Sequence, residues 1–208
     1  MDLEDYILNH ISPEPEHLSR LYRHTHLTHL YPRMCSGHLQ GRLLAMLVSM
    51  IKPHRVLELG TFTGYSAMCL AEALPEGGHV HTVEVDDEME EELTELFATS
   101  PRGDRITLHI GDALSVIPTI DEQWDLVYID ANKRDYIAYL DCLLPSLHPG
   151  SFIIADNTLW DGKVCDTIKN HDAQTVALDA FPTSVAPHPR LSSVILPLRD
   201  GLTLIRID

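Results

Sequence analysis

The chain has 208 residues and 44% of them are hydrophobic, which fits one sizeable α/β domain with its own core. A formal net charge of −16, from 15 basic and 31 acidic residues, argues against a polyanionic partner such as nucleic acid. The longest apolar-leaning run, residues 39–51, is too short and too polar to span a bilayer, and the acidic N-terminus is unlike a secretory signal. We therefore expect a cytoplasmic protein with no membrane contact.

The first 50 residues are predicted to be helical, with breaks near Pro13, Pro15 and Pro32, and to cap a single domain that covers residues 1–208. Their last part is the clearest helix, because apolar residues recur there at helical spacing. The predicted apolar face consists of Leu39, Leu43, Leu44, Leu47, Val48 and Ile51. Such a helix can lie on a sheet.

A histidine cluster, His24, His26 and His29, lies in the same helical region with the spacing H-x-H-x-x-H. Histidine-rich tracts of this kind can bind a transition metal. The alternative is a polar helix or lid over a cleft, and we favour that interpretation.

Residues 55–155 alternate between short apolar runs and helical patterns. The predicted strands cover residues 55–60, 80–85, 106–110, 125–130 and 151–155. The predicted helices cover residues 64–74 and 87–99, and a third follows the fourth strand and ends before Pro149. This alternation predicts βαβ units and a parallel sheet with right-handed crossovers.

The end of the chain follows a different pattern. Residues 158–190 are predicted to be loop and helix, and the apolar runs 193–198 and 202–207 are predicted to form a β-hairpin around Arg199-Asp200-Gly201. We therefore expect a parallel sheet that is completed by an antiparallel hairpin.

Acidic residues stand at the carboxyl ends of all five predicted parallel strands. In open α/β sheets, ligands bind beyond these ends. The residues are Glu58 with Gly60, Glu84, Asp112, Asp130, and Asp156 with Asn157. A shared edge of this kind favours a ligand with hydroxyl groups, a cation, or both.

The first strand leads into a glycine turn of the form E-x-G-x-x-x-G, formed by Glu58, Gly60 and Gly64. This spacing differs from the G-x-G-x-x-G turn that places a pyrophosphate at a helix N-terminus. Glu84, about 20 residues after the turn, is placed to accept hydrogen bonds from a ribose diol. A positively charged nucleoside without phosphate fits both features, and S-adenosylmethionine is such a ligand.

A second group combines Asp130 and Lys133 with Asp156 and Asn157. Two carboxylates and an amide oxygen are a hard-oxygen ligand set suited to Mg²⁺, Mn²⁺ or Ca²⁺. Lys133 is expected to point into the same cleft. In the alternative interpretation, Asp130 caps the following helix and Asp156-Asn157 forms a turn.

These segments resemble the metal-dependent class I O-methyltransferases, which include catechol and caffeoyl-CoA O-methyltransferases. The matching segments are residues 56–66, 83–86, 111–113, 125–133, 154–157, Trp160 with 162–164, and 200–204. They cover most of the chain from about residue 34 onward. The resemblance implies a Rossmann-like fold with a seven-stranded, mostly parallel sheet, a C-terminal antiparallel hairpin and helices on both faces.

The resemblance also implies a role for each matching site residue. Glu58 and Gly60 would flank the methionine part of the cofactor, with Tyr65 and Ser66 nearby. Glu84 would bind the ribose, Asp112 and Ala113 the adenine, and Met34 would lie near the sulfonium. The implied metal ligands are Asp130, Asp156 and Asn157, and Lys133 is the implied catalytic base, acting beside Asp130.

The expected acceptor is a small vicinal diol of catechol type, since basic residues that would grip a coenzyme A phosphate are not evident. Three alternatives stay open: a methylase of tRNA wobble 5-hydroxyuridine, a nicotinamide-dependent oxidoreductase, and a cofactor-binding protein without catalysis. A homodimer is expected from the resemblance alone.

Overall fold

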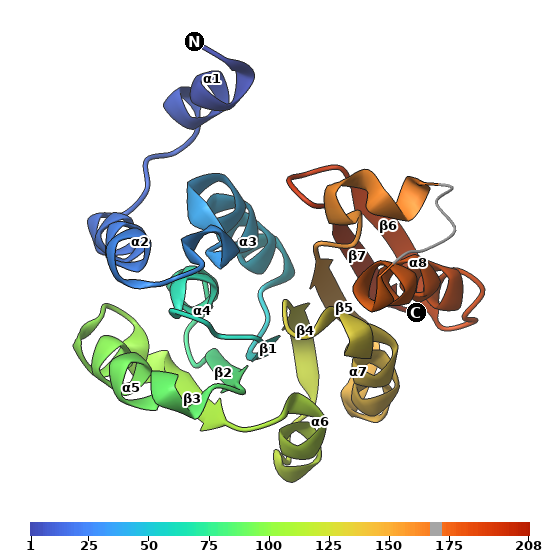
Figure 1. The fold of residues 1–208 in the computed structure, drawn as a ribbon. Helices are drawn as coiled ribbons and strands as arrows, with labels where there is room; N and C mark the ends of the chain where they lie inside the picture. The colour runs from blue at the N-terminus through green and yellow to red at the C-terminus, as the bar shows by residue number, and fades with distance from the viewer. Residues whose placement is uncertain (167–171) are drawn as a thin grey trace. The chain divides into compact units, whose positions relative to one another are not determined.

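The computed structural model describes residues 1–166 and 172–208. Within these residues, seven strands form one sheet in the order β3-β2-β1-β4-β5-β7-β6 (Figure 1). Every predicted strand is present, and the expected combination of a parallel sheet with a terminal antiparallel hairpin is confirmed.

The chain divides into two compact units, which are described separately. Unit 1 comprises residues 1–54 and 61–110, and unit 2 comprises residues 55–60 and 111–208. The assignment of residues 1–208 to one domain stays a prediction.

Unit 1 contains the helical N-terminal region and two parallel strands. Its helices are α1 (Leu3–His10), α2 (Glu16–Thr28), α3 (Gly37–Ile51), α4 (Tyr65–Glu72) and α5 (Glu90–Thr99), and its strands are β2 (His79–Glu84) and β3 (Ile106–Ile110). The helical breaks coincide with the predicted prolines: Pro13 and Pro15 separate α1 from α2, and Pro32 begins a short 3-10 helix before α3.

Helix α3 is confirmed, but its most buried face differs from the prediction. The buried residues are Gly37, Gln40, Gly41, Leu44, Ala45 and Val48, while Leu39, Leu43, Leu47 and Ile51 are only half-buried. The reason is Gly41, which lets α3 pack closely on α4. A Cβ added at Gly41 would lie 2.8 Å from the Cys69 Sγ and 3.0 Å from the Tyr65 ring. The helix–helix contact, rather than leucine spacing, therefore determines the buried face.

Unit 2 contains the other five strands. They are β1 (Arg55–Leu59), β4 (Trp124–Ile129), β5 (Leu147–Asp156), β6 (Leu191–Leu196) and β7 (Leu202–Ile207). Its helices are α6 (Ala113–Val116), α7 (Tyr136–Leu143) and α8 (Ala173–Val185). Strands β1, β4 and β5 are parallel and almost wholly buried, as expected for strands covered on both faces.

Strand β5 begins four residues earlier than predicted and includes Pro149 and Gly150. Its register against β4 shifts between Trp124 and Leu126, so the early part of β5 bulges. The Ser151 hydroxyl holds the bulge by donating to the Trp124 carbonyl at 2.7 Å and accepting from the His148 amide at 3.1 Å. A proline-glycine pair reads as a strand boundary in sequence, but the bulge accommodates both residues.

The terminal hairpin is inserted so that β7 lies between β5 and β6 (Figure 1). Strand β7 pairs with both neighbours in antiparallel fashion, and its backbone is largely buried. No helix among residues 1–166 and 172–208 is long and apolar enough to cross a membrane.

Candidate active site

In unit 1, the end of β2 holds Glu84 against the glycine turn. The Glu84 Oε2 accepts a hydrogen bond from the Phe62 amide at 2.7 Å, and its Oε1 accepts one from the Asp86 amide at 3.0 Å. The carboxylate is buried and its orientation is set by the backbone. Since each carboxylate oxygen has two lone pairs, Glu84 can still accept hydrogen bonds from hydroxyl groups of a ligand.

The other candidates in unit 1 differ in their surroundings. Met34 lies in the 3-10 helix Pro32–Met34 and is 54% exposed, so its side chain is available to a ligand. Ser66 is buried in the first turn of α4. Tyr65 is buried beside Gly41, and its hydroxyl donates to Glu14, so it is already engaged in the core of unit 1. The cofactor roles of these residues stay predictions.

In unit 2, the residue that follows β1 must be glycine. Gly60 has φ +95°, and a Cβ there would lie 2.3 Å from the Asp130 carbonyl oxygen and 2.8 Å from its carbonyl carbon. The Asp130 amide donates to the Leu59 carbonyl at 2.8 Å. Gly60 thus allows the chain after β1 to approach the chain after β4. Glu58, two residues earlier, is fully buried.

Gly60→Ala should lower the free energy of unfolding by about 3 kcal/mol or more, because left-handed strain adds to a backbone clash. Gly150→Ala is the matched control, since Gly150 also has φ +95° but has nothing within 4 Å of the added Cβ. Gly150→Ala should cost only about 1–2 kcal/mol from strain. Urea unfolding of both variants measures the difference. Equal losses would mean that the contact with Asp130 contributes nothing.

The end of β5 holds Asp156 in a defined orientation. Its Oδ2 accepts from the Tyr128 hydroxyl at 2.8 Å and its Oδ1 accepts from the Asn157 amide at 2.7 Å. The Tyr136 hydroxyl donates to the Asp156 carbonyl at 2.9 Å. Asn157 has φ +57°, a left-handed conformation that places it in a tight turn directly after the strand.

The sequence interpretation did not include Tyr128 and Tyr136. A signal for Tyr128 existed, because it pairs with Ile154 across the sheet and Asp156 follows on the same face. Seeing it requires the register between β4 and β5. Tyr136 contacts a carbonyl rather than a side chain, and residue types do not reveal such a contact.

Asp130 and Lys133 form a close ion pair, with 2.6 Å between the Lys133 Nζ and the Asp130 Oδ1. Burial raises the pKa of Asp130; the charge of Lys133 opposes that rise, and the charge of Asp156 adds to it. Asp130 and Asp156 are therefore near enough to repel one another. Two buried carboxylates that repel, followed by an amide side chain, fit a hard divalent cation.

Lys133 is held as an ammonium ion by this arrangement. Burial lowers its pKa, but the charge of Asp130, the neighbouring Tyr136 and the hydrogen bond to Asp130 outweigh burial, so the pKa is raised. The Nζ also lies 5.4 Å from the centre of the Tyr136 ring. The protonation state of Lys133 thus depends on the charge of Asp130.

Asp112 begins α6 as its N-cap, and its Oδ1 accepts from the Ser115 amide at 3.2 Å. Ala113, the first residue of α6, is buried. This capping role accounts for Asp112 structurally, and the adenine contact of Asp112 and Ala113 stays a prediction.

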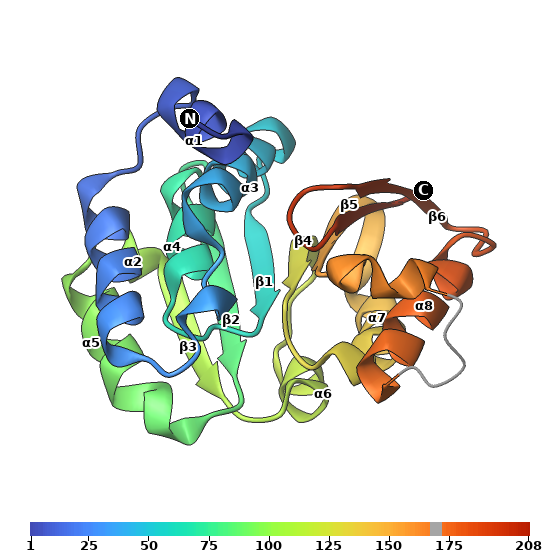
Figure 2. The same ribbon diagram turned by 45° about the horizontal axis from the view of Figure 1, so that its top comes forward.

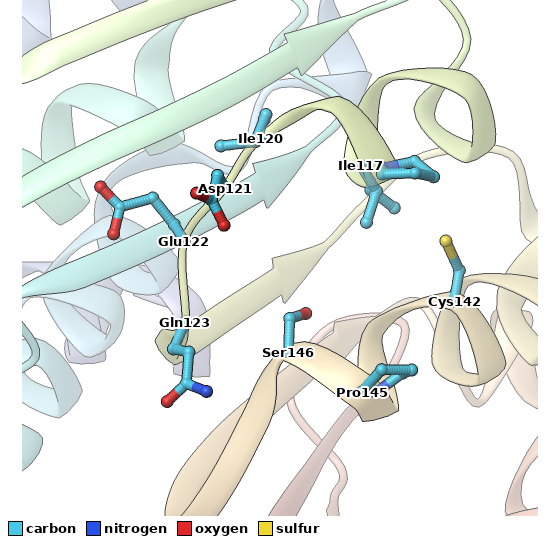
Figure 3. Close-up of a pocket in the computed structure, with 9 residues that line it drawn as sticks. Ile117, Ile120, Asp121, Glu122, Gln123, Cys142, Pro145 and Ser146 are labelled. Carbon is cyan, nitrogen blue, oxygen red and sulfur yellow. The ribbon is translucent and has the colours of Figure 1, made fainter.

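A cavity of about 670 Å³ opens at the amino end of β4, near the end of α7 (Figure 3). It is lined by Ile117, Pro118, Ile120, Asp121, Glu122, Gln123, Cys142, Pro145 and Ser146. None of the predicted site residues lines it. Ligands of parallel α/β sheets bind beyond the opposite, carboxyl ends of the strands, so we do not assign the cofactor to this cavity.

Comparison with known proteins identifies a family and several relatives. The sequence pattern of the family described as O-methyltransferase matches residues 9–207. A caffeoyl-CoA O-methyltransferase from Stellaria longipes is 30% identical over 98% of this chain and 89% of its own length. Caffeoyl-CoA O-methyltransferase 2 from Zea mays is 32% identical over 99% of this chain and 82% of its own length.

Two crystal structures show the same fold with a ligand named in their descriptions. The O-methyltransferase from Bacillus cereus in complex with SAH superimposes with a TM-score of 0.92 and is 27% identical, covering 99% of this chain and 97% of that one. The O-methyltransferase TomG from Streptomyces achromogenes, involved in tomaymycin synthesis and in complex with SAM, gives 0.90 and 29%, covering 99% and 95%.

Proposed function

Because the chain belongs to the O-methyltransferase family and is an S-adenosylmethionine-dependent O-methyltransferase, we propose that it methylates one oxygen of a small, catechol-like vicinal diol with the help of a divalent cation. The observation that supports this most is the pair of buried, mutually repelling carboxylates Asp130 and Asp156 beside Lys133. A homodimer, implied by the resemblance, is part of the same proposal.

The proposed metal ligands are Asp130, Asp156 and Asn157, and Mg²⁺ is the ion that we expect, with Mn²⁺ or Ca²⁺ as alternatives. The fixed orientation of Asp156, between the Tyr128 hydroxyl and the Asn157 amide, supports this assignment because a ligand held in place loses little entropy on binding. When bound, the cation would polarise two neighbouring acceptor oxygens and lower the pKa of one hydroxyl.

The proposed cofactor contacts come from both units. In unit 1, Glu84 would accept hydrogen bonds from the ribose, Met34 would lie near the sulfonium, and Tyr65 and Ser66 would lie nearby. In unit 2, Glu58 and Gly60 would flank the methionine part, and Asp112 with Ala113 would hold the adenine. The orientation of Glu84 by two backbone amides supports the ribose assignment.

Lys133 is the proposed base that accepts the proton of the acceptor hydroxyl. A base must be neutral, and the Asp130 charge now keeps this amine protonated. If that charge is shared with a cation, the burial of Lys133, which lowers its pKa, becomes the dominant effect. The neutral amine is then held within reach of the reacting oxygen by the backbone of the turn that starts the helix region at Lys133–Asp135.

The acceptor is proposed to be small and free of phosphate. The caffeoyl-CoA relatives act on a coenzyme A ester by name, but the net charge of −16 here disfavours the phosphates of such an ester. A diol places two oxygens on one cation, whereas a monophenol places one.

The test is turnover on a matched pair of acceptors, catechol and phenol, measured as S-adenosylhomocysteine formed. With Mg²⁺, catechol should be methylated and phenol should not, because phenol lacks the second metal-binding oxygen. EDTA should abolish the reaction, and added Mg²⁺ should restore it. Full activity in EDTA, or equal rates on the two acceptors, would contradict the metal and diol assignments. Methylation of unmodified or 5-hydroxyuridine-containing tRNA in place of catechol would point to the RNA substrate.

A further inference from the structure

The histidine cluster of α2 acquires a third partner from α5 in unit 1. The Nε2 atoms of His24 and His29 lie 3.6 Å and 3.1 Å from the Glu92 Oε1. One ligand atom from each of the three side chains lies within 4.8 Å of the other two. Figure 2 shows α2 beside α5, which brings together residues more than 60 positions apart in sequence.

We infer that His24, His29 and Glu92 form a second metal site, which binds Zn²⁺ and is separate from the Asp130 group. Two ligand atoms, each about 2.0–2.2 Å from a tetrahedral zinc ion, lie roughly 3.3–3.6 Å apart. The separations of 3.1 Å and 3.6 Å are close to this range. Two imidazoles and one carboxylate are a known zinc ligand set that leaves a fourth position for water.

The ligand chemistry separates this site from the proposed magnesium site. Imidazole nitrogen binds zinc and neighbouring transition metals far better than Mg²⁺, which prefers oxygen ligands and keeps its water. Glu90, Glu91 and Glu92 fill the first turn of α5, and this negative charge favours cations generally. The two histidines are what select a transition metal.

The site is partly preorganised. The His29 side chain is only 15% exposed, and its ring packs edge-on against the Phe62 ring at a centroid distance of 5.4 Å. The side chains of His24 and Glu92 are 54% and 39% exposed, so solvent and metal can reach them. Thr25, between the two histidines, donates a hydrogen bond to the Thr63 hydroxyl at 2.9 Å and fixes this part of α2 against the glycine turn.

His26 shares the sequence motif but not the site. Its Nδ1 lies 2.9 Å from the Tyr22 carbonyl, and its ring packs against the Tyr22 ring at 4.1 Å. His26 therefore provides a matched control on the same helix. Zinc bound by the other three residues would join α2 to α5 next to Phe62, whose amide holds Glu84.

The test is calorimetric titration of the untagged, metal-free full chain with Zn²⁺ in excess Mg²⁺, so that the hard-oxygen site is already filled. Wild type should bind one zinc ion per chain. His24→Gln, His29→Gln and Glu92→Gln should each weaken binding by about tenfold or more, whereas His26→Gln should change it less than about twofold. No zinc binding by wild type, or an equal loss in His26→Gln, would overturn the site.

Two further readouts protect this result against misfolding and against cysteine ligands. The melting temperature of wild type should rise by at least roughly 5 °C at zinc concentrations about 100-fold above Kd, and that of Glu92→Gln should not. Co²⁺ in place of zinc should give tetrahedral visible bands without a thiolate charge-transfer band. A thiolate band would assign the metal to cysteine and overturn the proposal.

Discussion

Lys133→Ala should lower kcat on catechol by about 10²–10⁴-fold, the usual contribution of a general base. The affinity for S-adenosylhomocysteine should change little, since the proposed task of Lys133 is to accept the proton of the acceptor. The variant leaves Asp130 without its ion-pair partner at 2.6 Å, so protein stability must be measured alongside kcat. Steady-state kinetics with saturating cofactor and Mg²⁺ give the kcat.

Lys133→Arg separates the base from the ion pair. Arginine keeps a positive charge beside Asp130 but is effectively always protonated, so it cannot accept the proton. We expect near-normal stability with kcat as low as in Lys133→Ala. An added primary amine should restore part of the kcat of Lys133→Ala only. An active arginine variant, or an unchanged kcat in the alanine variant, would remove Lys133 from the role of base.

Asp156→Asn should abolish metal-stimulated turnover while the fold is retained. The amide has the shape of the carboxylate, its oxygen can still accept from the Asn157 amide, and the Tyr128 hydroxyl can rotate to accept from its NH₂ group. The change therefore removes the charge and leaves the surrounding hydrogen bonds in place. The loss should appear as a rate that is low and independent of Mg²⁺ concentration.

Tyr128→Phe is the control for Asp156→Asn. It removes the hydroxyl that donates to Asp156 at 2.8 Å and leaves the charge on the carboxylate. Because an outer-shell hydrogen bond typically contributes 10–100-fold to metal affinity, Tyr128→Phe should need more Mg²⁺ but reach measurable turnover when saturated. Asp156→Asn with a normal Mg²⁺ dependence would contradict the assignment of Asp156 as a ligand.

The sheet was predictable because its signals are local. Short apolar runs bounded by glycine, proline and acidic residues gave the five parallel strands and the hairpin with small errors in their bounds. The acidic strand ends also predicted which side chains of each unit would gather. Asp130 with Lys133, and Asp156 with Tyr128, are contacts that follow once parallel strands are placed side by side.

What the sequence did not give depends on packing between distant segments. Gly41 is unremarkable in a helical pattern, yet it decides which face of α3 is buried because α4 crosses there. Glu92 is one acid in a charged helix until α5 comes to lie beside α2 and brings it to His24 and His29. Likewise, the bulge in β5 depends on a hydroxyl of Ser151 reaching across to β4.

The position of β7 constrains the order in which unit 2 can assemble during synthesis. Strand β6 leaves the ribosome before β7, but its sheet partner is β7, and β5 also pairs with β7 on that side. Until residues 202–207 emerge, β6 has no adjacent strand to join and the edge of β5 stays open to wrong pairing. A nascent chain stalled just after β6 should thus be protease-sensitive and prone to association, and release of the next dozen residues should end both properties.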